Sequence, residues 1–166
     1  CDRIRVDGEV LQLGNQDWTV LVTPGHHPGH VCLLSDAGLV AGDMVAGIGT
    51  ILIPPGTGDM DVYIEQLQRL QQLDPHLMFP SHGPVIPLPQ KTLAYYIKHR
   101  NERHQRVLDA VESGLATIPE ISTEAYANTP DAHPGLAQDQ TLAHLLSHER
   151  SGRVQQTNKG WIRGDD

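Results

Sequence analysis

Residues 23–30 of this chain read TPGHHPGH. This stretch follows residues 17–22, whose alternating apolar and polar side chains predict a β-strand. The stretch itself is built from proline, glycine and histidine, so we expect a loop. The sequence therefore places a loop rich in metal-ligand side chains at the carboxyl end of a strand. Binding sites of layered α/β proteins lie at such strand ends.

The elements around this loop are predicted from the period of the apolar residues. Four further segments alternate or are short and apolar, which predicts strands, and another has apolar residues at helical spacing. The strands are expected at 9–13, 31–34, 38–41 and 77–79, and the helix at 59–73. Asp59 or Asp61 can cap the start of this helix. The order of strands and helix is a layered α/β pattern.

Three ligand-type side chains, His26, Asp43 and His82, each follow one of these strands. Residues beyond the carboxyl ends of strands converge on one rim, and two imidazoles with one carboxylate suit Zn²⁺, Fe²⁺ or Mn²⁺. A glycine adjoins each ligand and allows a sharp turn there; these are Gly25, Gly42 and Gly83. From spacing alone, a turn histidine and an ordinary loop carboxylate are alternatives to a metal site.

The remainder of the chain predicts helices followed by a terminal hairpin. A long helix comes first, then a glycine hinge, two shorter helices and the hairpin; these are 90–112, Gly114, 118–128, 136–149 and 154–163. Helices followed by a hairpin suggest a winged-helix-like module. We therefore expect two domains, residues 1–113 and residues 114–166.

Composition excludes several classes of protein. The net charge is −8, and residues 1–90 hold three basic and ten acidic side chains, which suits cation binding. Neither half has the basic excess of a dedicated nucleic-acid binder. Cys1 and Cys32 do not make a disulfide framework, so a reducing, cytoplasmic setting is expected. No apolar run approaches the roughly 20 residues that span a bilayer, and no membrane partner is expected.

Three motifs, TPGHHPGH, VAGDMV and FPSHGPVI, resemble successive ligand motifs of the metallo-β-lactamase superfamily, in the right order. Residues 83–111 are similar to the long helix of the branch called β-lactamase-like protein 2, which also ends in a winged-helix domain. The resemblance covers residues 9–163. It implies the C-terminal half of an αββα sandwich, followed by a small winged-helix-like domain.

The resemblance also implies a role for each matching residue. His26 would bind a first metal ion, His82 a second, and Asp43 would bridge the two, while His30 would support the site by hydrogen bonding. Two divalent metal ions are implied, with zinc first and iron or manganese as alternatives. The HxHxDH motif of the family is absent, and with it the expected general acid or base. We therefore name no catalytic side chain and expect a truncated chain that binds metal weakly and is inactive alone.

The activity implied for the complete protein is hydrolysis of a small ester or thioester, or of a phosphodiester such as RNA. Lys98 and Arg103 are candidates for a substrate channel, although a solvated helix face explains them as well. The alternative is a non-catalytic fragment, or a binding module that acts through its winged helix. Because half a sandwich leaves an apolar sheet face bare, we expect the upstream half of the same protein, or self-association, to cover it.

Most of the ten histidines need no function. Six of them fall on predicted helices or loops without a ligand-like setting, and we expect them to be ordinary surface or helix residues. They are His76, His99, His104, His133, His144 and His148.

Overall fold

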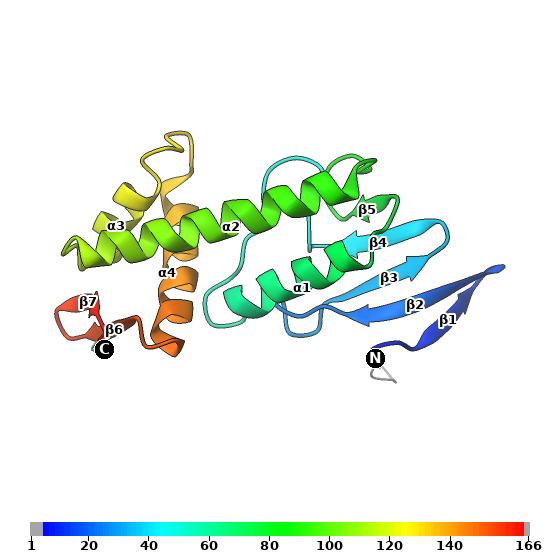
Figure 1. Cartoon of the computed structure of the whole chain (residues 1–166), viewed down its shortest axis with the longest axis horizontal. Helices are drawn as coiled ribbons and strands as arrows, with labels where there is room; N and C mark the ends of the chain where they lie inside the picture. The colour runs from blue at the N-terminus through cyan, green and yellow to red at the C-terminus, as the bar shows by residue number, and fades with distance from the viewer. Residues whose placement is uncertain (1–4, 165–166) are drawn as a thin grey trace.

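The computed structural model describes residues 5–164 and shows a mixed α/β fold (Figure 1). A five-stranded sheet has the order β1-β2-β3-β4-β5, and two further strands form a separate hairpin. The strands are β1 Val10–Leu13, β2 Gln16–Val22, β3 Val31–Ser35, β4 Gly38–Gly42, β5 Met78–Pro80, β6 Val154–Thr157 and β7 Gly160–Arg163. The helices are α1 Met60–Gln72, α2 Pro89–Glu112, α3 Ile118–Ala125 and α4 Pro134–Arg150.

The sheet is antiparallel from β1 to β4, and β5 then pairs with β4 in parallel. The parallel pairing requires a crossover, which α1 provides. The Asp59 side chain caps this helix by accepting hydrogen bonds from the backbone N–H groups of Asp61 and Val62. The predicted strands and the predicted start of the helix are therefore confirmed.

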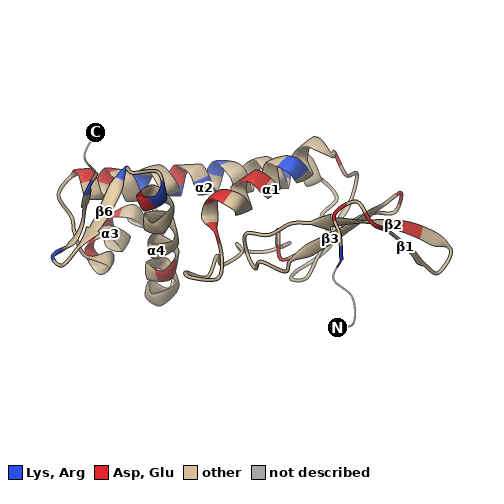
Figure 2. Ribbon diagram, turned by 90° about the horizontal axis from the view of Figure 1, so that it is seen from below, with Lys and Arg blue, Asp and Glu red and all other residues tan. Residues whose placement is uncertain are grey.

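One face of the sheet is covered by α1 and α2 (Figure 2). Apolar side chains of the sheet, such as Leu39 and Met78, pack there against Leu67 of α1 and Leu93 of α2, and all four are almost fully buried. This mostly aliphatic core supplies much of the driving force for packing the sheet against α1 and α2. It also fixes the ends of the strands, from which the candidate ligands project.

The opposite face of the sheet has no helix over it among the described residues (Figure 2). Leu33 lies opposite Val20 on β2 and opposite Val40 on β4, so these apolar side chains share that face. Val31 and Val40 are each 38% exposed. Val20 is fully buried, so the exposed apolar surface of this face lies at Val31 and Val40, and exposed apolar patches often mark protein-contact surfaces.

A second core lies at the far end of α2. Val107 and Val111 of that helix pack there with Ile121 of α3, Leu145 of α4 and Trp161 of β7. Helices followed by a hairpin are thus present, as the sequence indicates, while the winged-helix assignment and the domain boundary remain predictions. In the part of the chain that the structure describes, no helix is both long and apolar enough to cross a membrane.

Helix α3 ends at Ala125, three residues before the end predicted from the sequence. The Ala125 carbonyl accepts a hydrogen bond from the buried guanidinium of Arg103. The N–H of Thr129, which would bond to that carbonyl in a continuing helix, donates to Tyr126 instead. A side chain from another helix therefore ends α3, which local sequence does not reveal.

Of the two cysteines, Cys32 is free and buried, and Cys1 lies outside the described residues.

Candidate functional site

The loop after β2 presents His26 through a close contact between backbones. Gly25 has φ +129°, and a Cβ atom there would lie 2.4 Å from the Cα of Tyr63, so only glycine fits. The Tyr63 hydroxyl donates to the carbonyl of Met44 at 2.7 Å, and burial raises the pKa of this phenol. Tyr63 therefore holds two loops together, one beside His26 and one beside Asp43.

The ring of His26 is oriented by a hydrogen bond to the backbone. Its Nδ1 lies 2.7 Å from the carbonyl oxygen of Leu52. Because a carbonyl only accepts, Nδ1 must carry the proton, which leaves the lone pair of a neutral ring on Nε2. Metal-binding histidines commonly have this second hydrogen bond, which leaves the other nitrogen free to coordinate.

The Asp43 carboxylate lies between two imidazoles. Its Oδ2 is 3.9 Å from Nε2 of His26, and its Oδ1 is 3.3 Å from Nε2 of His82. Oδ1 is buried and accepts no hydrogen bond from any described residue. A buried carboxylate oxygen without a donor is costly, and an atom in this state is usually explained by a bound cation or an ordered water.

The structure thus brings together the three side chains that the sequence singled out. Nε2 of His26 and Oδ2 of Asp43 lie 3.9 Å apart, too far for a hydrogen bond, and with a neutral ring both atoms would present electron pairs to a cation between them. The donors therefore fit part of a metal site. Within residues 5–164, however, no group of three or more His, Cys, Asp or Glu side chains forms a metal-binding cluster by itself.

His82 differs from the other two candidate ligands in its exposure. Its side chain is 72% exposed, against 25% for His26 and 31% for Asp43. The loop that carries it is fixed by its backbone, since the N–H of Gly47 donates to the His82 carbonyl at 2.8 Å. The imidazole is therefore largely exposed, while its backbone is held by a hydrogen bond beside Asp43.

His30 supports the position of Asp43 and uses both ring nitrogens to do so. The backbone N–H of Asp43 donates to His30 Nε2 at 2.9 Å, so the His30 proton is on Nδ1, which donates to Thr23 Oγ1 at 2.8 Å. Burial lowers the pKa of His30, which keeps it neutral. Gly42 makes this contact feasible, because a Cβ atom there would lie 2.4 Å from His30 Nε2.

The structure does not place the two candidate channel residues on one surface. The Lys98 side chain is 74% exposed and lies 3.7 Å from Glu102, whereas Arg103 is 4% exposed. The Arg103 guanidinium lies over the Tyr126 ring at 3.6 Å and donates to Thr129 Oγ1 at 2.7 Å. Arg103 therefore joins α2 to α3 and also lines a cavity with Arg100, whereas Lys98 is not in that lining, and a substrate channel formed by Lys98 and Arg103 stays a prediction.

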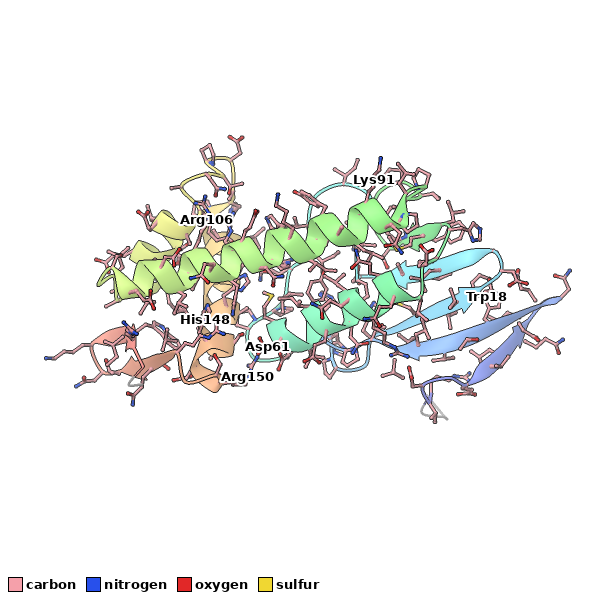
Figure 3. The ribbon with its side chains drawn as sticks, viewed as in Figure 1. Trp18, Asp61, Lys91, Arg106, His148 and Arg150 are labelled. Carbon is pink, nitrogen blue, oxygen red and sulfur yellow. The ribbon has the colours of Figure 1, made fainter. Side chains whose placement is uncertain are left out.

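A buried histidine cluster was missed by the sequence reasoning. His104 on α2 stacks on His148 of α4, and its Nδ1 lies 3.1 Å from Nδ1 of His144. His144 and His148 have no exposed surface, so they are not surface residues. Figure 3 shows His148 near Asp61 and Arg150, where the start of α1 meets α4. The spacing of His144 and His148 by four residues on one helix is the only sequence signal of this cluster.

The profile of the metallo-β-lactamase superfamily matches residues 1–82, which include all three candidate ligands. The chain belongs to the metallo-β-lactamase superfamily. One relative in the superfamily is the β-lactamase-like protein 2 homologue of Drosophila melanogaster. It is 30% identical, over 93% of this chain and 56% of the relative.

Two further proteins are similar to this chain. The atrochrysone carboxyl ACP thioesterase of Aspergillus fumigatus is 31% identical, over 75% of this chain and 43% of its own length. A β-lactamase domain protein from Burkholderia ambifaria superposes with a TM-score of 0.83 at 24% identity. That match covers 98% of this chain and 52% of the other. The chain therefore has a mixed α/β fold that superposes on about half of this solved structure, and it spans about half the length of the relatives that it matches.

Proposed function

We propose that this chain supplies three ligands of a dinuclear metal site in a hydrolase. The observation that carries the proposal is the Asp43 carboxylate, whose two oxygens each face one imidazole, of His26 and of His82. In this proposal His26 holds one divalent ion, His82 holds the other and Asp43 bridges them. Zinc is the first choice of metal, and iron or manganese also suits two imidazoles and one carboxylate.

The bound ions would supply an activated water and stabilise negative charge that develops on the substrate. The chain's own residues have a different task, which is to hold the ligands in place before metal arrives. His30 fixes the backbone of Asp43, and Leu52 fixes the ring of His26. Such support raises the basicity and the order of the ligands.

A small ester or thioester is the proposed substrate. The name of the Aspergillus fumigatus relative, a thioesterase, supports this class. A cavity of about 330 Å³ also lies beside the segment that holds His26, with Leu52, His99 and Ala137 in its lining. That volume suits a small ligand. Arg103 also lines this cavity but is only 4% exposed, and Lys98 lies outside the lining and pairs with Glu102, so this proposal prefers an ester or thioester over RNA.

The uncovered sheet face supports a proposed partner. Val31, Val40 and Leu33 lie on the face that no described helix covers. We propose that the segment carrying the HxHxDH ligands packs on this face and completes the site. Self-association through the same face is the alternative.

The test compares Asp43→Asn with Asp36→Asn in the longest form of the protein that carries an HxHxDH segment. Asp36 lies in an exposed turn, so its variant controls for the loss of one carboxylate. We expect about two metal ions per wild-type molecule and loss of metal and of thioester hydrolysis in Asp43→Asn alone. Thioester hydrolysis that survives chelation, or equal metal content in all three proteins, would overturn the proposal.

A non-catalytic binding module is the second candidate. It is favoured by the absence of a complete metal cluster from residues 5–164. In that case the longer protein would bind its partner through the C-terminal helices and hairpin, and removal of metal would leave binding unchanged. Equal affinity for nucleic acid or protein partners with and without chelator would support it, and activity lost on chelation would reject it.

A further inference from the structure

Residues 51–53 link the candidate ligand His26 to the C-terminal helices. The carbonyl of Leu52 accepts the hydrogen bond that orients His26. Ile51 and Ile53 on either side are 6% and 0% exposed, so their backbone groups need partners inside the protein. These partners are side chains of α2 and α4, which lie far from residues 51–53 in the sequence.

Gln140 of α4 pairs with Ile53 through both ends of its amide. Its Nε2 donates to the Ile53 carbonyl at 2.8 Å, and its Oε1 accepts from the Ile53 N–H at 3.1 Å. These two hydrogen bonds reproduce the pairing that a neighbouring β-strand would make with Ile53. Gln140 is 7% exposed, so water does not compete strongly for the two bonds.

Arg100 of α2 closes the network. Its guanidinium donates to the Ile51 carbonyl and to Oε1 of Gln140, the latter at 2.9 Å. The carbonyls of Ile51 and Ile53 are therefore held by the helices, while the carbonyl between them, that of Leu52, bonds to His26. The partners show that the carbonyls of Ile51 and Ile53 face the C-terminal helices, whereas the carbonyl of Leu52 faces His26. Fixing the outer two consequently fixes the middle one toward His26.

We propose that Gln140 and Arg100 are positioning residues for the metal site, which they serve by holding residues 51–53 and so the ring of His26. The proposal rests on the proposed function only for the identity of His26 as a ligand. It assigns the C-terminal helices a part in metal binding, although no described side chain of α2 or α4 forms a hydrogen bond or ion pair with Asp43. Loss of the Gln140 bonds frees the Leu52 carbonyl to turn, and the His26 proton then exchanges between Nδ1 and Nε2.

The experiment uses Gln140→Leu, with Gln138→Leu on the same helix as its matched control. Gln138 has the same side chain but makes no bond to residues 51–53. The ¹⁵N chemical shifts of the His26 ring report which nitrogen carries the proton, and circular dichroism reports folding. In Gln140→Leu we expect shifts that move toward a mixture of the two tautomers, and Gln138→Leu should match the wild type.

Zinc binding gives the second readout. Loss of a group that supports a ligand typically weakens metal binding about 10-fold or more, and we expect a Kd for zinc raised about 10-fold in Gln140→Leu. If the leucine variant fails to fold, Gln140→Ala leaves room for a water at Ile53 and is compared with Gln138→Ala. Unchanged His26 shifts in a folded Gln140 variant would overturn the positioning role.

The two readouts separate this inference from the proposed function. His26 shifts that change in a protein that binds no zinc, either alone or with an HxHxDH segment, would support the positioning network and overturn the metal site. Unchanged shifts with an unchanged, measurable zinc Kd would support the metal site and overturn the network.

Discussion

His104 stacks on His148 with the two ring centroids 3.6 Å apart and the planes inclined by 19°. Burial lowers the pKa of His104 to about 4, and it also lowers the pKa of His144 and of His148. Charged groups of both signs face the cluster; they are Asp61, Arg100, Arg103, Glu112 and Arg153. The three imidazoles are therefore neutral in the folded protein at pH 7.

The free energy of unfolding should fall as the pH decreases from 7 to 5. The unfolded chain takes up protons near pH 6.5, whereas His104 in the folded protein does so near pH 4, so acid favours the unfolded state. Each unit of difference in pKa is worth about 1.4 kcal/mol before solvent screening, and we expect a total loss of about 1 kcal/mol or more.

Urea unfolding at the two pH values measures this loss. His144→Leu should reduce the dependence on pH, while His76→Leu, at an exposed position, should leave it unchanged. If the free energy of unfolding depends on pH equally in both variants, groups outside the histidine cluster cause the loss of stability in acid. Asp61 titrates below the same window, because the Ser147 and Arg150 hydrogen bonds outweigh its burial and lower its pKa.

Gly42→Ala should destabilise the protein by about 2–3 kcal/mol, since the new methyl group would collide with His30 Nε2. Gly14→Ala is the control, because Gly14 has a similar φ of +67° but open space at the Cβ position, and should cost about 1 kcal/mol. Chemical denaturation of both variants gives the two values. Equal losses would mean that φ alone, and not the His30 contact, requires glycine at position 42.

Arg103→Ala should cost about 2–4 kcal/mol of stability, because it leaves the buried carbonyl of Ala125 without its donor and empties the space over Tyr126. Lys98→Ala should change stability by less than about 0.5 kcal/mol, since its pair with Glu102 is exposed. Thermal melts of the two variants make the comparison. Any loss of RNA cleavage in Lys98→Ala, with stability intact, would restore the case for a channel.

Val40→Lys should reduce self-association of this chain at high concentration. The change places a charge on the uncovered sheet face, where Val40 is 38% exposed. Ile162→Lys, on the terminal hairpin and 45% exposed, controls for the added charge. Sedimentation velocity at several concentrations distinguishes the two, and a wild type that stays monomeric would contradict the expected association.

Much of the fold could be predicted from the sequence because its elements follow local rules. The alternation in residues 17–22 and the aspartate before α1 act within a few residues, and both appear where expected. The three candidate ligands were also found from their place after strands. Local rules fail where a side chain distant in the sequence determines the end of an element. At the end of α3, the Arg103 guanidinium donates a hydrogen bond to the carbonyl of Ala125.

The parts of the site that could not be predicted depend on contacts between distant segments. Nothing near Gln140 or Ile53 indicates that they pair across 87 positions of sequence. The burial of His144 and His148 likewise depends on the packing of α4 against α2. Because histidine is polar, the sequence alone argues against its burial. Two histidines four residues apart on one helix lie on the same face and so share an environment. This spacing does not tell whether that face is exposed to solvent or buried in the core.

Helix α2 runs through both cores, with Leu93 in the first and Val107 in the second. Its 24 residues form one continuous helix. Unfolding of either core would therefore destabilise the helix on which the other core packs. Heating should therefore produce a single cooperative transition and one calorimetric peak. A metal ion bound at the rim of the sheet would then slow hydrogen exchange at the distant Trp161 hairpin as well as at its own ligands.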